Sequence, residues 1–93
     1  MADFTYQVFS EVAKQKTLVA AAKQLQVTPS AVSHSLAGFE KQLGFPLFVR
    51  NRNGVKLTPD GAKILPIVQE LLNTEAKLAE EAARINGLNQ GQI

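Results

Sequence analysis

The stretch LVAAAKQLQVTPSAVSHSLA, residues 18–37, decides the fold of this chain. It predicts a short alanine-rich helix that begins after Thr17, a tight connection, and a longer helix that opens at Thr28. Thr28 is a good N-cap, and Pro29 at the first helical position loses no hydrogen bond because its N–H would be unpaired in any case. A short helix, a tight turn and a longer helix are the proportions of a helix-turn-helix motif.

The longer helix is expected over residues 28–43, with Gly44 and Pro46 ending it. A buried apolar stripe is predicted by the helical spacing of Val32, Leu36, Phe39 and Leu43. The N-terminal half of the opposite face is small and polar, without an acid before Glu40, and it comprises Pro29, Ser30, Ser33 and His34, with Ala37 and Lys41 beyond. Such a face can approach phosphates and base edges in a major groove. An ordinary solvated helix face has the same composition, so this face alone leaves both interpretations open.

Two short β-prone runs follow, one on each side of Asn51-Arg52-Asn53-Gly54. The Asn53-Gly54 dipeptide predicts a hairpin with a type I′ turn, because that turn needs two positive φ angles. Arg50, Arg52 and Lys56 concentrate positive charge around it. We interpret residues 47–57 as a wing that enters a minor groove or grips phosphates. The alternative is a charged edge that only prevents strand aggregation.

The remaining segments complete a mainly α fold. A first helix is predicted from Phe4 to about Lys14 with Asp3 as its N-cap, and a fourth from Pro59 to about Asn86. The fourth helix would be roughly 40 Å long, with a kink at Pro66. We expect a winged helix-turn-helix of three helices and a two-stranded wing in residues 1–58, a long linker and dimerisation helix in 59–86, and a hinge in 87–93.

The fourth helix carries apolar residues on two faces. A heptad-like seam is formed by Ile64, Val68, Leu71, Leu78, Ala82 and Ile85, with Glu75 as a misfit, and a second stripe by Leu65, Leu72, Ala76, Ala79 and Ala83. One stripe can cover the helix's own domain, but the other needs a partner. We therefore expect a homodimer, which predicts an inverted-repeat operator. The alternative is that both stripes pack within one chain.

Composition excludes several classes of function. The 93 residues carry a net charge of +2, but residues 1–57 hold +4 and residues 58–93 hold −2, which places any polyanion on the front half. With no cysteine and only one histidine, His34, the chain offers no metal site, cofactor site or nucleophile with its base, so we expect no enzyme. No apolar run is long enough to span a membrane and no signal peptide is visible, so we expect a cytoplasmic protein without a membrane partner.

The spaced motifs together resemble the N-terminal domain of LysR-type transcriptional regulators, which are bacterial DNA-binding proteins. The resemblance rests on Phe4, Phe9, Val12-Ala13, Ala21-Ala22, Leu25, the run Val27–Ser33, Glu40, Leu43-Gly44, Leu47–Arg50 and Leu57–Gly61. It implies that Thr28, Pro29, Ser30, Ser33, His34, Arg50 and Arg52 face double-stranded DNA, and Asn53 and Lys56 complete our set of candidate DNA-binding residues. Pro29 and His34 stand where the family often has Gln and Arg, so base readout is expected to be weak or to use DNA shape.

The resemblance also bears on partners. The family carries a much larger C-terminal effector-binding domain of periplasmic-binding-protein type, which these residues lack. We therefore expect a piece of a longer regulator, in which a small-molecule effector acts only through that domain and a tetramer is a further assembly open to the full-length protein. The alternative function is a winged helix for protein–protein contact, which would show an apolar patch in place of the charged wing.

Overall fold

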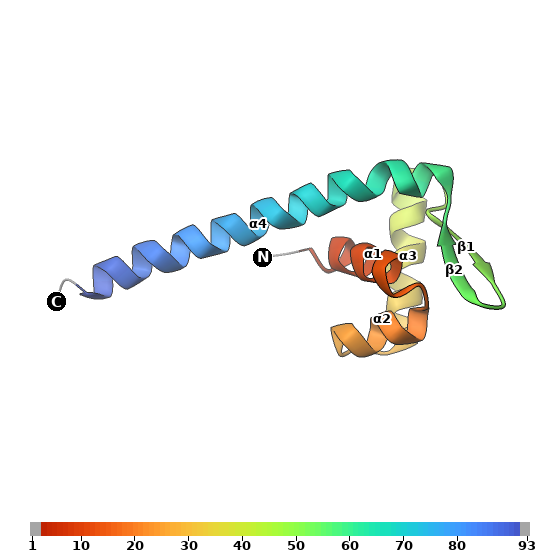
Figure 1. The fold of residues 1–93 in the computed structure, drawn as a ribbon, viewed down its shortest axis with the longest axis horizontal. Coiled ribbons are helices and arrows are strands. Elements are labelled where there is room, and N and C mark those ends of the chain that lie inside the picture. Colours follow the sequence, from red (N-terminus) through yellow and green to blue (C-terminus); the bar gives the residue numbers. More distant parts are fainter. Residues whose placement is uncertain (1–2, 92–93) are drawn as a thin grey trace.

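Three short helices and a hairpin gather at one end of a long helix (Figure 1). The computed structural model describes residues 3–91. Its elements are α1 (Phe4–Gln15), α2 (Leu18–Leu25), α3 (Pro29–Leu43), β1 (Phe48–Asn51), β2 (Gly54–Leu57) and α4 (Pro59–Gly91). The predicted winged helix-turn-helix with a long following helix is therefore confirmed.

The first three helices begin where their capping side chains predict. Asp3, Thr17 and Thr28 each accept a hydrogen bond from a backbone N–H two or three residues further on, at 2.9 to 3.1 Å. Such bonds satisfy N–H groups that the first helical turn leaves unpaired. Gly44 ends α3 in the left-handed conformation, with φ of +93°, as expected.

The core lies where α1, α2 and α3 meet the hairpin and the first turns of α4. Its centre is Phe9, whose ring packs edge-on against Phe39 of α3 and Phe48 of β1, with centroids 5.8 and 5.5 Å apart. The buried apolar residues are Val8, Phe9, Val12, Ala21, Ala22, Val32, Leu36, Phe39, Leu47 and Val68. They confirm the stripe predicted on α3, with Leu43 partly buried at its end.

The peptide groups around Leu47 join α3, the wing and α4. The Leu47 N–H donates to Oε2 of Glu40 at 2.6 Å, and the Phe48 N–H donates to the same oxygen at 3.2 Å. The Leu47 carbonyl accepts from the Thr58 N–H at 2.9 Å, and the Leu47 side chain is fully buried. This junction orients the wing relative to α3.

Removal of the Glu40 carboxylate is expected to loosen this junction. Glu40→Ala leaves two backbone N–H groups without their acceptor, and a hydrogen bond to a charged group contributes about 1.5–3 kcal/mol to stability. We expect urea denaturation to show a loss of about 2 kcal/mol in the free energy of unfolding. Glu11→Ala is the control, because among residues 3–91 the Glu11 carboxylate accepts a hydrogen bond only from the Gln15 side chain. Equal losses in both variants would contradict the assigned role of Glu40.

The turn of the wing differs from the prediction. Asn51 pairs with Gly54, so Arg52 and Asn53 form the turn, and Gly54 alone among these residues has a positive φ, of +132°. The expected type I′ turn at Asn53-Gly54 is therefore wrong. The Asn53 N–H donates to Oδ1 of Asn51 at 2.8 Å, which closes the turn one residue earlier.

Gly54 instead allows the wing to approach the α1–α2 connection. A Cβ atom at this position would lie 2.3 Å from the Lys16 carbonyl oxygen. The same carbonyl accepts from the Val55 N–H at 3.0 Å. Lys16 itself has a φ of +68°, which is uncommon for a residue with a side chain. The wing is therefore held to the connection between α1 and α2 as well as to α3.

The long helix α4 continues to Gly91, so its expected end near Asn86 and the hinge at 87–93 are wrong for the described residues, while residues 92 and 93 lie outside them. Gly87 has no positive φ here and continues the helix, since one internal glycine costs only about 1 kcal/mol. Pro66 also lies within α4, and Figure 1 shows a gentle curve of the helix in place of the expected kink.

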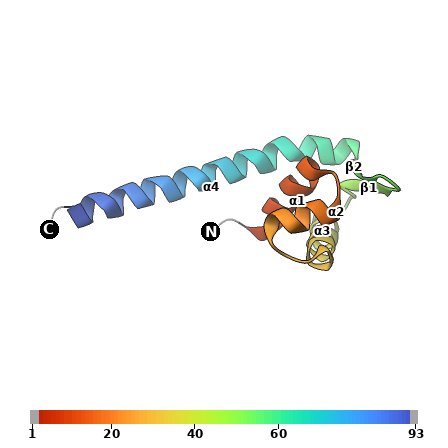
Figure 2. The same ribbon diagram turned by 60° about the horizontal axis from the view of Figure 1, so that its bottom comes forward.

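Two residues of the predicted seam on α4 pack inside their own domain. Val68 is only 2% exposed and belongs to the core, and Ile64 is partly buried against it, as are Leu65 and Leu72 of the second stripe. The first turns of α4 lie across α1 (Figure 2), which explains this burial. Val68 therefore has almost no surface left for a partner, since periodicity does not show where along the helix the domain ends. The interface role of the partly buried Ile64 stays a prediction.

Candidate nucleic-acid interface

The N-terminal half of α3 presents its polar face to solvent. Thr28, Pro29, Ser30 and His34 are exposed and Ser33 is half-buried, as the helical spacing predicted. The first turn of α3 carries no acidic residue. Its free N–H groups and partial positive charge can therefore meet a phosphate.

The wing presents a cationic surface beside this face. Arg50, Arg52, Asn53 and Lys56 are all exposed. Arg50 reaches α3 directly, because its Nη2 atom donates to Oγ of Ser33 at 2.8 Å. Two candidate residues 17 positions apart in the sequence therefore form one surface. The separation of Ser33 and Arg50 in the sequence did not predict this hydrogen bond.

The positive charge of this surface is not neutralised within the described part of the chain. The only ion pair between residues 3 and 91 joins Arg84 and Glu81 on α4. Glu40, the acid on α3, turns its carboxylate to the backbone of Leu47 and Phe48. The wing cations are therefore available to an external anion.

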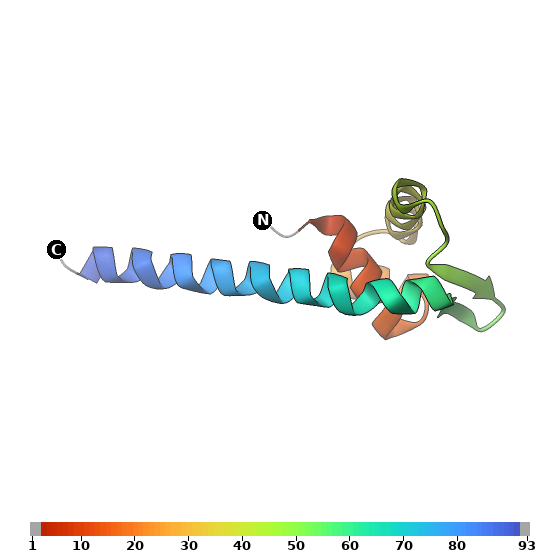
Figure 3. The same ribbon diagram turned by 90° about the horizontal axis from the view of Figure 1, so that it is seen from above.

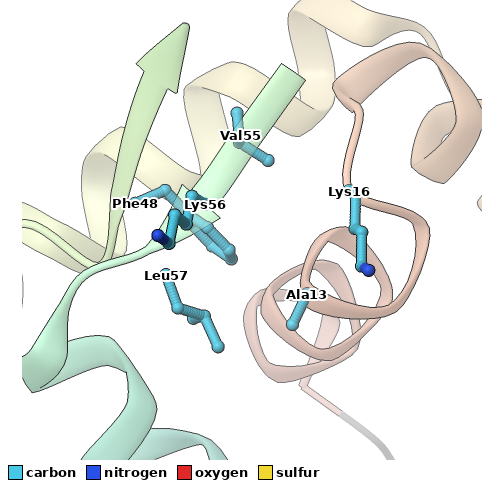
Figure 4. Close-up of a pocket in the computed structure, with 6 residues that line it drawn as sticks. All are labelled: Ala13, Lys16, Phe48, Val55, Lys56 and Leu57. Carbon is cyan, nitrogen blue, oxygen red and sulfur yellow. The ribbon is translucent and has the colours of Figure 1, made fainter. Parts of the chain in front are cut away.

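Lys16 is a cation beside the wing that the sequence analysis did not single out. It lines a pocket of about 440 Å³ with Ala13 of α1 and with Phe48, Val55, Lys56 and Leu57 of the wing (Figure 4). The backbone bond from Val55 to Lys16 brings these segments together. Lys56 therefore lies near a second lysine, whereas Arg50 lies at α3.

Residues 3–91 show neither a candidate metal site nor a helix that could span a membrane. Among residues 3–91, no group of three or more His, Cys, Asp or Glu side chains could hold a metal ion. In the same range, no helix has both the length and the apolar character needed to cross a membrane.

Comparison with known proteins identifies the family. Residues 5–62 match the family model described as bacterial regulatory helix-turn-helix protein, lysR family. The chain belongs to the LysR family. The resemblance that the sequence motifs suggested is therefore confirmed.

Curated LysR-family relatives include the HTH-type transcriptional regulator HdfR of Salmonella newport (strain SL254) and of Salmonella typhimurium. Each is 39% identical over 85 residues, which cover 91% of this chain and 31% of the relative. The chain thus spans about a third of the length of these relatives. They are transcriptional regulators, not enzymes.

Solved structures share the fold. The CbnR DBD–DNA complex has a TM-score of 0.83 at 25% identity and covers 90% of this chain and 97% of that one. The BenM DBD/catB site 1 DNA complex has a TM-score of 0.85 at 25% identity, with coverage of 91% and 96%. This LysR-family chain is therefore a winged-helix domain of the DNA-binding type.

Proposed function

We propose that the chain binds double-stranded DNA in a sequence-specific way, with α3 in the major groove and the wing on the minor groove or phosphates. The observation that carries this proposal is the Arg50–Ser33 hydrogen bond, which joins the acid-free start of α3 to the cationic wing in one surface. Two structural neighbours are complexes with DNA. A module for protein–protein contact would need an apolar patch where exposed cations lie here.

Each element has its own part in this proposal. The residues of α3 that contact base edges and nearby phosphates are Thr28, Pro29, Ser30, Ser33 and His34. From the wing, Arg52, Asn53 and Lys56 contact phosphates and the minor groove, and Arg50, which reaches α3, is placed to contact a phosphate or a base edge. Contacts to phosphates position the domain, and contacts to base edges select the sequence.

We also propose that the chain forms a homodimer through the half of α4 that projects beyond the domain (Figure 3). Exposed apolar residues follow one face of α4 from beside the domain into this half, and we call them the exposed stripe: Ile67, Leu71, Leu78, Ala82, Ile85 and Leu88. A helix with an uncovered apolar face needs a partner, and a second copy supplies the same face. Oε1 of Glu75 is buried without a hydrogen-bond partner, which a donor from the second copy would satisfy. Two α3 helices would then read an inverted repeat.

Removal of two wing cations tests the DNA-binding proposal. Arg50→Ala combined with Arg52→Ala is expected to weaken binding to every duplex and to lower the slope of log K against log salt by at most about two units. Fluorescence anisotropy with labelled duplexes over a salt series measures both effects. Lys63→Ala combined with Lys77→Ala removes the same charge from α4 and is expected to change the slope less. An unchanged slope in the wing variant, with unchanged thermal stability, would contradict phosphate contact by the wing.

A further inference from the structure

Ser33 and Arg50 present their polar groups as a pair. Oγ of Ser33 accepts a hydrogen bond from Nη2 of Arg50 at 2.8 Å, and this is the only hydrogen bond that the described residues give the hydroxyl. Thr28, at the start of the same helix, is used similarly, since its Oγ1 accepts from the Ala31 N–H at 3.1 Å. Both hydroxyls therefore have an acceptor position occupied from within the protein.

The Ser33–Arg50 pair keeps free hydrogen-bond donors but no favourable acceptor. A serine hydroxyl has one O–H donor and two lone pairs, whereas a guanidinium has five N–H donors and no acceptor. One lone pair of the Ser33 oxygen already accepts from the Arg50 guanidinium. A further donor that approached the other lone pair would be repelled by the positive charge of Arg50. What the pair has left to offer is therefore the Ser33 O–H and the other guanidinium N–H groups, which all donate.

This arrangement also supplies what α3 lacks. The exposed N-terminal half of α3 has no Arg or Gln, the side chains best suited to bidentate recognition of bases. Arg50 brings a guanidinium to this face from the wing. The wing thus adds to α3 the group that its own sequence omits.

We propose that Ser33 and Arg50 form one donor-only reading unit that selects acceptor groups on DNA. This inference rests on the proposed DNA binding and specifies its ligand chemistry. In the major groove, guanine offers two adjacent acceptors, N7 and O6, whereas adenine and cytosine present an amino donor. A phosphate oxygen has the same acceptor chemistry. The position of Ser33 on the exposed face of α3 favours the guanine edge.

A base-analogue experiment tests the inference. A preferred duplex is first selected from a random library with the 93-residue chain, and each guanine is then replaced by 7-deazaguanine, which lacks N7, or by inosine, which keeps N7 and O6. At one guanine per half-site, 7-deazaguanine is expected to weaken binding about 5- to 100-fold, and inosine much less. Ser33→Ala and Arg50→Ala should each remove most of this penalty, and the double variant should remove no more than either, because the two act as a unit. Arg52→Ala is the matched control and should retain the penalty.

The remaining outcomes separate the possible sources of the acceptor. If a methylphosphonate penalty disappears in Ser33→Ala while no guanine penalty depends on Ser33, the acceptor is a phosphate and the donor-only unit stands. If neither penalty depends on Ser33 in variants of unchanged thermal stability, the inference is overturned although selective DNA binding stands. If the unmodified chain binds selected and scrambled duplexes equally, the proposed function itself fails, and this inference fails with it.

Discussion

Leu78→Asp is expected to weaken binding to a duplex with two half-sites by about 100- to 10,000-fold. The reason is that linking two DNA-binding modules makes the second binding event intramolecular, and separation of the modules loses that gain. Leu78 is 56% exposed in the single chain, so the substitution removes no core contact of its own domain. An aspartate on the exposed stripe would instead place a charge in the proposed interface. Sedimentation measures the loss of the dimer and fluorescence anisotropy the loss of affinity.

Asn73→Asp is the matched control for this substitution. Asn73 is exposed and lies on the opposite side of α4 from Leu71. The substitution therefore adds the same negative charge as Leu78→Asp, but away from the exposed stripe. We expect this variant to remain a dimer and to bind as before. A chain that is monomeric at micromolar concentration before and after Leu78→Asp, with unchanged affinity, would show that the stripe is not an interface.

Phe9→Ala is expected to have the largest effect on stability. Phe9 is fully buried and its ring joins α1 to Phe39 of α3 and to Phe48 of β1. Truncation of a buried phenylalanine costs about 3–5 kcal/mol, because apolar burial is lost and a cavity remains. Domains of this size are stable by only about 5–15 kcal/mol, so much of the margin disappears. Urea denaturation followed by circular dichroism measures the change.

Phe4→Ala serves as the comparison within the same helix. The Phe4 side chain is 40% exposed, so its removal leaves no enclosed cavity and should cost about 1 kcal/mol or less. Equal losses in the free energy of unfolding for the two variants would contradict the placement of Phe9 at the centre of the core. A selective loss at Phe9 would also lower DNA affinity, because the same cluster holds the wing to α3.

Local features of the sequence determined the elements and the family. Caps such as Asp3, Thr17 and Thr28 act on N–H groups within three residues, so a short stretch of sequence contains both partners. The stripe on α3 follows from helical spacing alone. The polar start of α3 was predicted for the same reason, because the face opposite a buried stripe is exposed. The candidate set on α3 and the charged wing could therefore be named from the sequence.

Only the tertiary structure decided which of these features meet. Periodicity showed two apolar faces on α4, but whether Val68 is buried depends on where α1 crosses it. The turn of the wing moved because Gly54 is needed against the Lys16 carbonyl, a contact between segments far apart in the chain. The Arg50–Ser33 bond arises in the same way, since the Leu47 junction sets the angle between wing and α3. Contacts of this kind depend on packing between elements, and the spacing of residues within one element does not contain that information.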